Sequence, residues 1–408
     1  MADDPTLPRL LYIGDVPVES SYHGSALLYR LLEDYPAGRL LILECDGNSS
    51  LPERRLPGTT YVHLPPGRLL SRLQNTRFHQ WSASSRLLGA SGGISRIERA
   101  LGDFQPEAVL TVAQGYAWLA AARFARERGL PLHLVVHDDW PTLVPVIPQL
   151  RPQCHRVFRR VYQQAFSRLC VSPPMAEDYE RRYGVSGHVL YPSRKAGGAA
   201  HTSPPDRTDA PARPFTVGYM GTLSAMGYVM VLRLVAAALG SMGGMLRVYG
   251  PVSPGEAPTL GLDLGNVMIR GLIPADAIVS TVREECDALV VPMSFAPEDA
   301  VALRLNFPSK LTDCSAAALP ILIVSPPDLS AARWATDNHG VALLVTDLDT
   351  ASIQQAIELL AADPQLRAAL GSRAGTVGAR QFSAQEARHE FHAHLSGNPA
   401  PITPSPPS

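Results

Sequence analysis

The chain has 408 residues, a formal net charge of −1, and 46% hydrophobic against 18% charged residues. This hydrophobic content excludes a chain that is disordered throughout, because disorder requires low hydrophobicity and a high net charge. The balanced charge argues against a nucleic-acid partner, since phosphate binding needs an excess of basic residues. The length is that of two or three domains.

The N-terminal sequence, the apolar runs and the cysteines indicate the cellular compartment of the protein. The N-terminal sequence MADDPTLPRL is acidic and lacks the apolar stretch of a secretion signal. No run of 18 apolar residues occurs, so we expect no membrane-spanning helix. The five cysteines are widely spaced and odd in number, which favours reduced thiols over disulfides or a zinc finger. We therefore predict a cytoplasmic protein.

Short apolar runs alternate with helical patterns in the first 192 residues. Strands are expected at 9–14, 39–44, 60–64, 107–112, 131–137, 168–172 and 188–191, and helices at 23–35, 116–128 and 174–183. This alternation is typical of βαβ units in a doubly wound parallel sheet. We therefore predict that residues 1–192 form a Rossmann-like N-terminal domain.

A stretch rich in Pro, Gly, Ala and Ser at 193–213 predicts an interdomain linker. A second alternation follows, with strands at 215–221, 246–250, 267–271, 287–293, 318–324 and 341–345, and helices at 228–240, 275–285, 308–318, 350–362, 364–378 and 383–395. We predict a second Rossmann-like domain at 214–385, and a helix end with a disordered tail at 386–408. The expected fold class is α/β, with two Rossmann-like domains facing across a cleft.

Several common motifs are missing. The chain has no GxGxxG after a strand and no GxxxxGK[ST], which disfavours a dinucleotide enzyme and a P-loop NTPase. His389 and His392 could share one helix face, but His394 could not, so we predict no metal site.

Residues 287–324 hold the most informative pattern. A buried strand and a polar loop lead to Pro308 and Ser309, which open a helix. The start of a helix favours an anion, and Lys310, one of two lysines beside 34 arginines, adds a positive charge there. Asp313 lies on the same helix face, in position to accept hydrogen bonds from hydroxyls. Such a pocket fits a nucleotide diphosphate with its ribose.

The stretch PSKLTDCSAAALPIL is similar to the donor-binding helix of retaining GT-B glycosyltransferases of family 4, also called group 1. In that family the pattern runs P-S-K-L-x-E-Y-x-A-x-G-x-P-V. FTVGYMGTLS and LRVYGP resemble the first two strands of the family's C-terminal domain, and LVVHDDW a strand of its N-terminal domain. The resemblance covers most of 107–385. It implies the GT-B fold and metal-independent, retaining transfer of a sugar from a nucleotide-sugar, without a cofactor.

The resemblance also implies roles for the residues of the donor side. Asp313 takes the place of the second Glu of the family's E-x7-E pattern, which holds the nucleotide ribose. Lys310 and the backbone of Ser309 would face the diphosphate. Gly221 and Thr222 would pack against the phosphates from the neighbouring loop.

Further residues are implied to lie near the reacting centre. His137 would approach the donor sugar and, with Lys310, is the expected catalytic residue. His23 and Gly24 are expected on the acceptor side, where the glycine leaves room.

Two positions depart from the family pattern. Leu305 stands where the first Glu is expected, and the candidates to replace it are Glu298, Asp299, Arg304 and Asn306; of these, Arg304 and Asn306 are predicted donor contacts. Met226 stands where a basic residue usually follows the glycine loop. These losses leave open a catalytically inactive partner or scaffold subunit of the same architecture, and a sugar-nucleotide epimerase on the same frame is a third interpretation.

Eight arginines between residues 53 and 99 are interleaved with leucines and Trp81. A basic amphipathic stretch is typical of a membrane surface contact or an anionic acceptor site. We therefore expect a carbohydrate or lipid-linked acceptor and a peripheral contact of 68–99 with the inner face of the membrane. A solvated helix face is the alternative interpretation.

Overall fold

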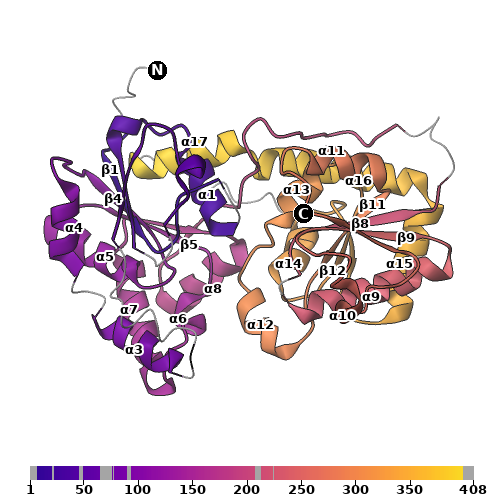
Figure 1. The fold of residues 1–408 in the computed structure, drawn as a ribbon, viewed down its shortest axis with the longest axis horizontal. Helices are drawn as coiled ribbons and strands as arrows, with labels where there is room; N and C mark the ends of the chain where they lie inside the picture. The colour runs from indigo at the N-terminus through magenta and orange to yellow at the C-terminus, as the bar shows by residue number, and fades with distance from the viewer. Residues whose placement is uncertain are drawn as a thin grey trace. The chain divides into compact units, whose positions relative to one another are not determined.

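The computed structural model describes residues 7–20, 23–45, 49–64, 76, 78–89, 93–206, 213–223 and 225–397. The chain divides into two compact units (Figure 1). The first consists of Met1–Tyr191 with Ala384–Ser408, and the second of Pro192–Ser383. Each contains one parallel sheet with helices, which confirms the predicted α/β class with two Rossmann-like domains.

The first unit is built on a sheet of strand order β3-β2-β1-β4-β5-β6-β7, counted over its described residues. The strands are β1 Leu10–Gly14, β2 Leu40–Glu44, β3 Thr60–His63, β4 Ala108–Val112, β5 Leu132–Val136, β6 Ser167–Cys170 and β7 His188–Val189. The helices are α1 His23–Leu32, α3 His79–Gly89, α4 Ile94–Leu101, α5 Ala117–Arg128, α6 Trp140–Leu143, α7 Arg151–Gln164, α8 Pro173–Tyr183 and α17 Ala384–Leu395. The central strands are buried throughout, as expected of parallel strands covered on both faces.

The second unit has a sheet of order β10-β9-β8-β11-β12-β13 in the part that the structure describes. The strands are β8 Thr216–Met220, β9 Met245–Tyr249, β10 Val267–Gly271, β11 Ala288–Pro292, β12 Ile321–Val324 and β13 Leu343–Val345. The helices are α9 Met226–Ser241, α10 Ala257–Leu260, α11 Ile278–Glu285, α12 Pro297–Leu303, α13 Lys310–Ala316, α14 Ser330–Asp337, α15 Thr350–Ala362 and α16 Pro364–Gln381. Its core joins β8, β9, β11 and β12 to helices α9 and α15.

The strand order reverses once beside the first strand of each sheet. In the first unit the reversal lies between β1 and β4, and in the second between β8 and β11. Ligands of open α/β sheets bind outside the carboxyl ends of the strands at such a point. The loops that follow these strands are therefore the place to look for a site in each unit.

The last helix, α17, belongs to the first unit although it follows the second in sequence. Ala387, Phe391 and Leu395 are buried in the core of the first unit, with residues of α1. Arg388 also contacts Glu33 at 3.2 Å and Asp34 at 3.0 Å. The sequence division after residue 385 did not reveal this, because the helix pattern does not identify its partner. The tail at 398–408 lies outside the described residues.

The stretch 193–213, predicted as a linker, groups with the second unit. In its described part, the Arg194 N–H donates to the Phe382 carbonyl at 2.9 Å, and the His201 N–H donates to the Ala316 carbonyl at 2.8 Å. The Arg194 side chain is buried. The segment therefore lacks secondary structure but packs along the second unit, which composition alone could not reveal.

Some helices differ from the prediction. The loop after β11 contains α12, Pro297–Leu303, where only a polar loop was expected. The sequence reading also missed α7 and α14. In α7 only Cys154, Phe158 and Tyr162 are buried, so its apolar stripe is too narrow to stand out from the surrounding arginines.

Candidate functional site

Lys310 lies at the start of α13 in the second unit, beside two aromatic rings. Its ammonium nitrogen Nζ is 4.8 Å from the ring centroid of Tyr219 and 4.6 Å from that of Tyr228. Nζ also donates a hydrogen bond of 3.3 Å to the Tyr219 hydroxyl. The faces of aromatic rings attract cations, so these two residues fix the position of the lysine charge.

The charge of Lys310 has no carboxylate partner among the described residues of the chain. Burial lowers the pKa of Lys310 to about 8, because desolvation disfavours the charged form, while the nearby Cys314 acts in the opposite direction. A bound anion would restore the lost solvation and raise this pKa. This arrangement is chemically suited to an anion.

The loop after β8 lies against Lys310. Gly221 has φ of +136°, a conformation that favours glycine, and a Cβ placed there would lie 3.7 Å from Cε of Lys310. Its N–H donates to the Tyr249 carbonyl at 2.9 Å. The carbonyl of Thr222 accepts a hydrogen bond of 2.7 Å from the Tyr219 hydroxyl. The structure therefore brings the predicted Gly221, Thr222 and Lys310 together.

The start of α9 lies at the same place. Tyr228, which contacts the ammonium, is in the first turn of this helix. Gly227 packs so closely on Ser294, in the loop after β11, that a Cβ would lie 1.8 Å from the Ser294 hydroxyl oxygen. Ala225 at the N-cap makes no side-chain hydrogen bond to the helix. A helix start and a lysine are therefore combined, which favours binding of a phosphate.

The side chain of Met226 is 56% exposed in that first turn and adds no charge. The missing basic residue of the family pattern is therefore not replaced at this position. The positive charge that lies against this first turn is that of Lys310, through Tyr228.

Asp313 and Ser309 lie on either side of Lys310 in α13. Ser309 is at the N-cap, and its side chain makes no capping hydrogen bond. Asp313 is partly buried in the first turn of the helix. Burial lowers the pKa of the nearby Arg194 guanidinium to about 10, and the negative charge of Asp313 partly opposes this shift.

Arg194 is a residue that the sequence reading missed. Its guanidinium donates to the Thr312 carbonyl at 3.0 Å and to the Ser315 hydroxyl at 2.9 Å, so it holds α13 from beneath. It is only 7% exposed, and burying a charged group requires such partners. The arginine-rich composition and the unpatterned stretch around Arg194 concealed it.

The loop between β11 and α13 supplies the remaining donor-side candidates. Leu305 is 2% exposed and therefore part of the core, which explains why no Glu stands there. Arg304 follows α12 and is exposed. The carbonyl of Asn306 accepts a hydrogen bond from the Ser330 hydroxyl. Asp299 lies close enough to Tyr228 to raise the pKa of that phenol, after the larger effect of burial.

His137 follows β5 in the first unit and lies against Gly24. A Cβ at Gly24 would be 2.9 Å from the ring nitrogen Nδ1 of His137, so only glycine leaves space for the ring. Burial lowers the pKa of His137, and the neighbouring Asp138 partly opposes this shift. The Nε2 atom is buried without a hydrogen-bond partner among the described residues. The side chain of His23 lies outside the description.

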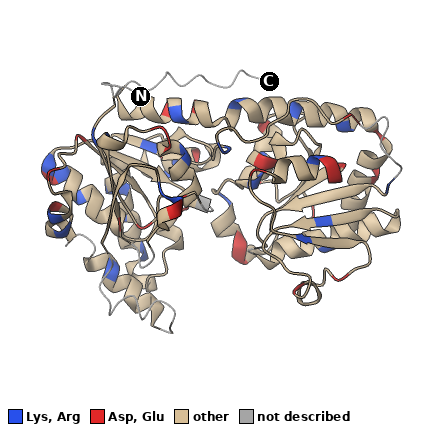
Figure 2. Ribbon diagram, turned by 45° about the horizontal axis from the view of Figure 1, so that its top comes forward, with Lys and Arg blue, Asp and Glu red and all other residues tan. Residues whose placement is uncertain are grey.

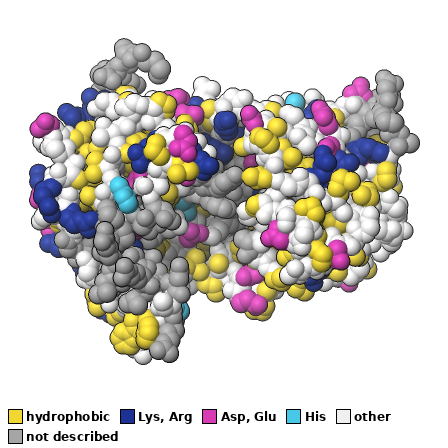
Figure 3. Space-filling view, in the orientation of Figure 1, with side chains coloured by type: hydrophobic (Ala, Val, Ile, Leu, Met, Phe, Trp, Pro, Cys, Tyr) yellow, Lys and Arg dark blue, Asp and Glu magenta, His cyan; other side chains and the backbone are white. Residues whose placement is uncertain are grey.

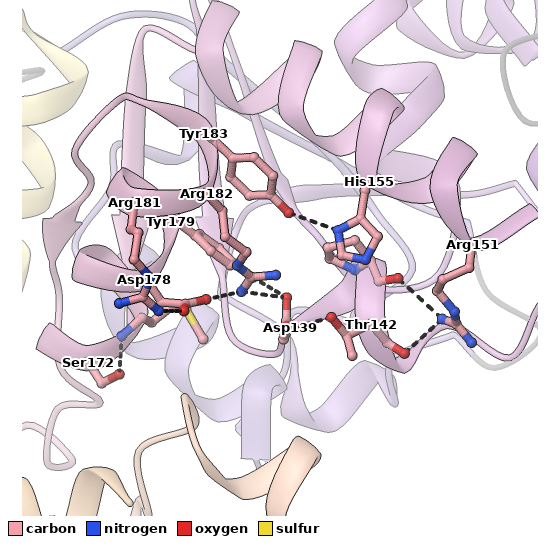
Figure 4. A network of polar contacts seen from close by, with 12 residues as sticks. Asp139, Thr142, Arg151, His155, Ser172, Asp178, Tyr179, Arg181, Arg182 and Tyr183 are labelled. Atoms are coloured by element: carbon pink, nitrogen blue, oxygen red, sulfur yellow. Dashed lines mark hydrogen bonds and ion pairs between the residues drawn. The ribbon is translucent and has the colours of Figure 1, made fainter. Parts of the chain in front are cut away.

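The loop that carries His137 is anchored by Asp139 (Figure 4). The carboxylate of Asp139 accepts hydrogen bonds from the Tyr179 hydroxyl at 3.1 Å and the Thr142 hydroxyl at 2.7 Å, and Arg182 contacts it at 3.1 Å. Arg151 holds the following turn through the Thr142 carbonyl at 2.7 Å. Asp139 is therefore structural, and it fixes the backbone of His137 and Asp138.

Asp15, at the end of β1, occupies the start of α5. Its carboxylate accepts hydrogen bonds from the N–H groups of Tyr116 and, at 2.7 Å, Ala117. Gly115, with φ of +59°, leaves room for this carboxylate. The helix start at the strand reversal of the first unit is thus already satisfied by an acidic side chain.

Within the described residues, no helix is long and apolar enough to cross a membrane. The same part of the chain contains no group of three or more His, Cys, Asp or Glu side chains suited to a metal ion. The rings of His394 and His188 instead lie tilted to one another with their centroids 4.2 Å apart, and the ring of His392 lies edge-on to that of Tyr35 with centroids 5.7 Å apart.

Comparison with known proteins connects these observations. Residues 51–193 match the family model described as Glycosyltransferase Family 4. No curated protein sequence matches the chain. Among solved structures, HepE of Anabaena in complex with UDP has 15% identity and a TM-score of 0.65, covering 95% of this chain and 99% of HepE.

Two further solved structures are similar over nearly their whole length. Sucrose-phosphate synthase of Thermosynechococcus elongatus has 15% identity and a TM-score of 0.63, covering 94% of this chain and 97% of its own. The UDP-forming trehalose-phosphate synthase of Burkholderia vietnamiensis has 14% identity and a TM-score of 0.62, covering 95% and 100%. The resemblance inferred from the sequence is thus confirmed: the chain has the GT-B glycosyltransferase fold, and residues 51–193 match Glycosyltransferase Family 4.

Proposed function

We propose that this protein is a glycosyltransferase that moves a sugar from a nucleotide-sugar to a hydroxyl acceptor. The observation that carries the proposal is the ammonium of the partly buried Lys310, held over two aromatic rings beside the Gly221 loop and the start of α9. A similar fold was determined with UDP and with UDP-glucose in HepE, which supports a nucleoside diphosphate as the anion.

The arrangement supports a specific catalytic role for Lys310. As the bond between sugar and diphosphate breaks, negative charge grows on the leaving phosphate oxygens. The ammonium and the N–H groups of the adjacent helix start stabilise this charge without reorganising, which is a large contribution in such reactions. We infer that these groups replace a metal ion and that no cofactor besides the donor is needed. Transfer with retention at the sugar carbon belongs to the same proposal.

Other residues are proposed to orient the donor. Asp313 would accept hydrogen bonds from the ribose hydroxyls, and Ser309, Arg304 and Asn306 would contact the donor from the same side. His137, whose Nε2 is buried without a partner in the described chain, would donate to or accept from a sugar hydroxyl. Asp299 is our candidate for the missing first Glu, because its charge acts on Tyr228 beside Lys310.

A membrane-associated acceptor is supported by helix α3. Phe78, Trp81 and Leu88 are 45%, 64% and 69% exposed, and their spacing places them along one stripe of the chain at and within this helix. Figure 3 shows hydrophobic side chains at the lower end of the first unit, where Figure 1 labels α3. Exposed aromatic and leucine side chains beside basic residues are typical of a membrane-surface contact.

The eight arginines of this region do not form one free patch. Arg55 contacts Glu44 and stacks over Tyr61, and Arg99 donates to the Ser95 carbonyl. Figure 2 shows Lys and Arg along the helices of the first unit. Arg68, Arg72 and Arg77 lie outside the described residues. We therefore assign the proposed peripheral contact, at the inner face of the membrane, chiefly to the apolar stripe.

Sedimentation with vesicles of phosphatidylcholine and phosphatidylglycerol tests the membrane contact. Trp81→Ser with Leu88→Ser should abolish binding, whereas Leu359→Ser, another exposed leucine, should leave it unchanged. Equal binding of both variants would contradict the assignment.

A panel of nucleotide-sugars tests the proposed function. Isothermal titration should show that a nucleoside diphosphate binds, and incubation of the matching nucleotide-sugar with an acceptor should release that diphosphate in the presence of EDTA. The inactive scaffold subunit remains the second candidate, because Met226 and the buried Leu305 carry no charge. Binding without turnover with any acceptor would favour the scaffold, and no binding of UDP, GDP or ADP would overturn the transferase and likewise favour the scaffold.

A further inference from the structure

A second pocket lies within the first unit, at the carboxyl ends of β4 and β5. Its volume is about 430 Å³, and its wall includes one face of α3 together with the loops after these two strands. His79, Ser82, Ala83 and Arg86 recur at intervals of three and four residues, so α3 presents a single face to the pocket. The apolar stripe of Phe78, Trp81 and Leu88 lies on a different face of the same stretch.

Arg86 supplies a positive charge to this pocket. Its guanidinium carbon is 4.6 Å from the ring centroid of Tyr116, so the side chain is stacked and its rotation is restricted. No carboxylate pairs with Arg86 among the described residues. A stacked guanidinium without an acidic partner retains its hydrogen-bond donors for a ligand, and its planar fork matches a phosphate or carboxylate.

Tyr116 is a second and independent indication of a ligand. It is 9% exposed, and its hydroxyl is buried without a hydrogen-bond partner among the described residues. Burial raises the pKa of Tyr116 to about 12, although Arg86 partly opposes this shift, so the phenol stays protonated and can donate. A buried hydroxyl without a partner costs free energy that a ligand oxygen would recover.

The pocket also borders the loop that carries His137. Asp138 forms part of its wall and directly follows His137, and Asp139 fixes the backbone of both. A carboxylate accepts hydrogen bonds from hydroxyls, whereas Arg86 binds anions. The wall of the pocket thus combines a carboxylate with a guanidinium.

We propose that this pocket binds the acceptor, and that the acceptor is a hydroxyl compound which carries a phosphate or carboxylate group against Arg86 and Tyr116. The inference rests on the proposed function in one respect, namely that the ligand of this pocket is the acceptor of the transfer. Binding of an anion in the pocket can be tested without turnover. A soluble sugar derivative and a lipid headgroup share this chemistry.

Binding of small probes distinguishes a soluble sugar derivative from a lipid headgroup. Isothermal titration would compare glucose, glucose 6-phosphate, glucuronate and dihexanoyl phosphatidylinositol, each with the free protein and with the protein saturated with UDP. At least one anionic probe should bind at least tenfold more tightly than glucose. Preference for the sugar derivatives identifies a soluble acceptor, and preference for the phosphatidylinositol identifies a headgroup.

Variants of the pocket decide whether Arg86 is responsible. Arg86→Met should reduce the affinity for the anionic probe to that for glucose, about a tenfold to hundredfold loss, as expected for a charge-assisted hydrogen-bond pair. Tyr116→Phe retains the ring and should weaken binding several-fold. Arg99→Met on α4 is the matched control and should change nothing. Arg86→Lys, which retains charge but loses the fork, should be intermediate and serves if Arg86→Met does not fold.

Two results would overturn the inference: no anionic probe binds better than glucose, or the preference survives in Arg86→Met. The UDP titration distinguishes this failure from failure of the proposed function. UDP should bind Arg86→Met and the natural protein equally, because Lys310 belongs to the other unit. If the protein binds an anionic probe through Arg86 but does not bind UDP, the inference about the pocket stands and the proposed transferase function is rejected.

Discussion

The two units have the same kind of sheet, but they differ in what lies at the N-terminus of the helix beside the strand reversal, which is α5 in the first unit and α9 in the second. In the first unit the carboxylate of Asp15 accepts the N–H groups at the start of α5. In the second unit the N-cap residue of α9 makes no side-chain hydrogen bond to the helix, and the ammonium of Lys310 lies against its first turn. One helix start is therefore satisfied by the chain's own anion, and we propose that the other binds an external one.

This contrast shows that fold alone does not make a phosphate site. Both units offer helix dipoles and glycine-containing loops after parallel strands. We propose that a nearby charge decides the outcome, since an internal carboxylate fills the first site, whereas the lysine beside the second has no acidic partner among the described residues and would attract an anion.

Replacing Lys310 should have the largest effect. Lys310→Met should weaken binding of the nucleoside diphosphate at least a hundredfold, because it removes the charge that the described part of the site supplies to the phosphates. The melting temperature should stay equal or rise, since a buried ammonium without a carboxylate partner is unfavourable. Lys195→Met, the other lysine and an exposed one, is the control. A variant that loses both binding and stability would indicate a structural lysine.

Replacing Arg194 should have the next largest effect, and it tests the helix that carries Lys310. Arg194→Met leaves the Thr312 carbonyl and the Ser315 hydroxyl without this donor, so we expect a loss of about 2 kcal/mol in the free energy of unfolding. The Michaelis constant for the donor should rise more than the turnover number falls. Arg373→Met, an exposed arginine of the same unit, should change neither. Unfolding by urea with parallel kinetics provides both readouts.

Acidification should destabilise the first unit through two histidines. Burial lowers the pKa of His133 to about 4 and that of His394 to about 4. The unfolded chain therefore binds more protons than the folded one between about pH 6.5 and 4, so the stability is complete above pH 6.5 and falls as the pH decreases through this window. The expected loss between pH 7 and 5 is about 2 kcal/mol from the buried His133, and His394, which is only partly buried, adds a smaller loss.

Denaturation at a series of pH values tests this expectation. His133→Gln should remove the larger part of the dependence and leave that of His394, because the amide can still hydrogen-bond to Ser167 but does not titrate in this range. A natural protein whose stability is constant from pH 7 to 5 would contradict the burial of these rings.

Removing the carboxylate of Asp15 should have a smaller effect, and it tests the other half of the comparison. Asp15→Ala should cost about 1 kcal/mol, as for other lost helix caps, and should make the melting temperature sensitive to added sulfate, which can bind the exposed N–H groups. Binding of UDP should not change. Insensitivity to sulfate would mean that the carboxylate alone does not explain why this site differs from that of the second unit.

The sequence predicted the strands, because parallel strands are continuous apolar runs. It also singled out Gly221, Thr222 and Lys310, which the structure brings together, because PSKL is a compact local pattern. It missed Arg194 and the packing of α17 on the first unit, because both depend on contacts between segments far apart in the chain. Gly24 and His137 were predicted separately, and only the fold brings them into contact. The missing first Glu could not be located from the pattern, because Leu305 is a core residue and α12 was not foreseen.

The most direct test of the central claim is the titration of Lys310 by NMR. With two lysines in the chain, labelling of lysine with ¹³C at Cε should give two signals, and Lys195→Met assigns them. We predict that the Lys310 ammonium titrates near pH 8 in the free protein and that its pKa rises by one unit or more when UDP or another nucleoside diphosphate binds. A Lys310 signal that does not change with any nucleoside diphosphate would contradict the account.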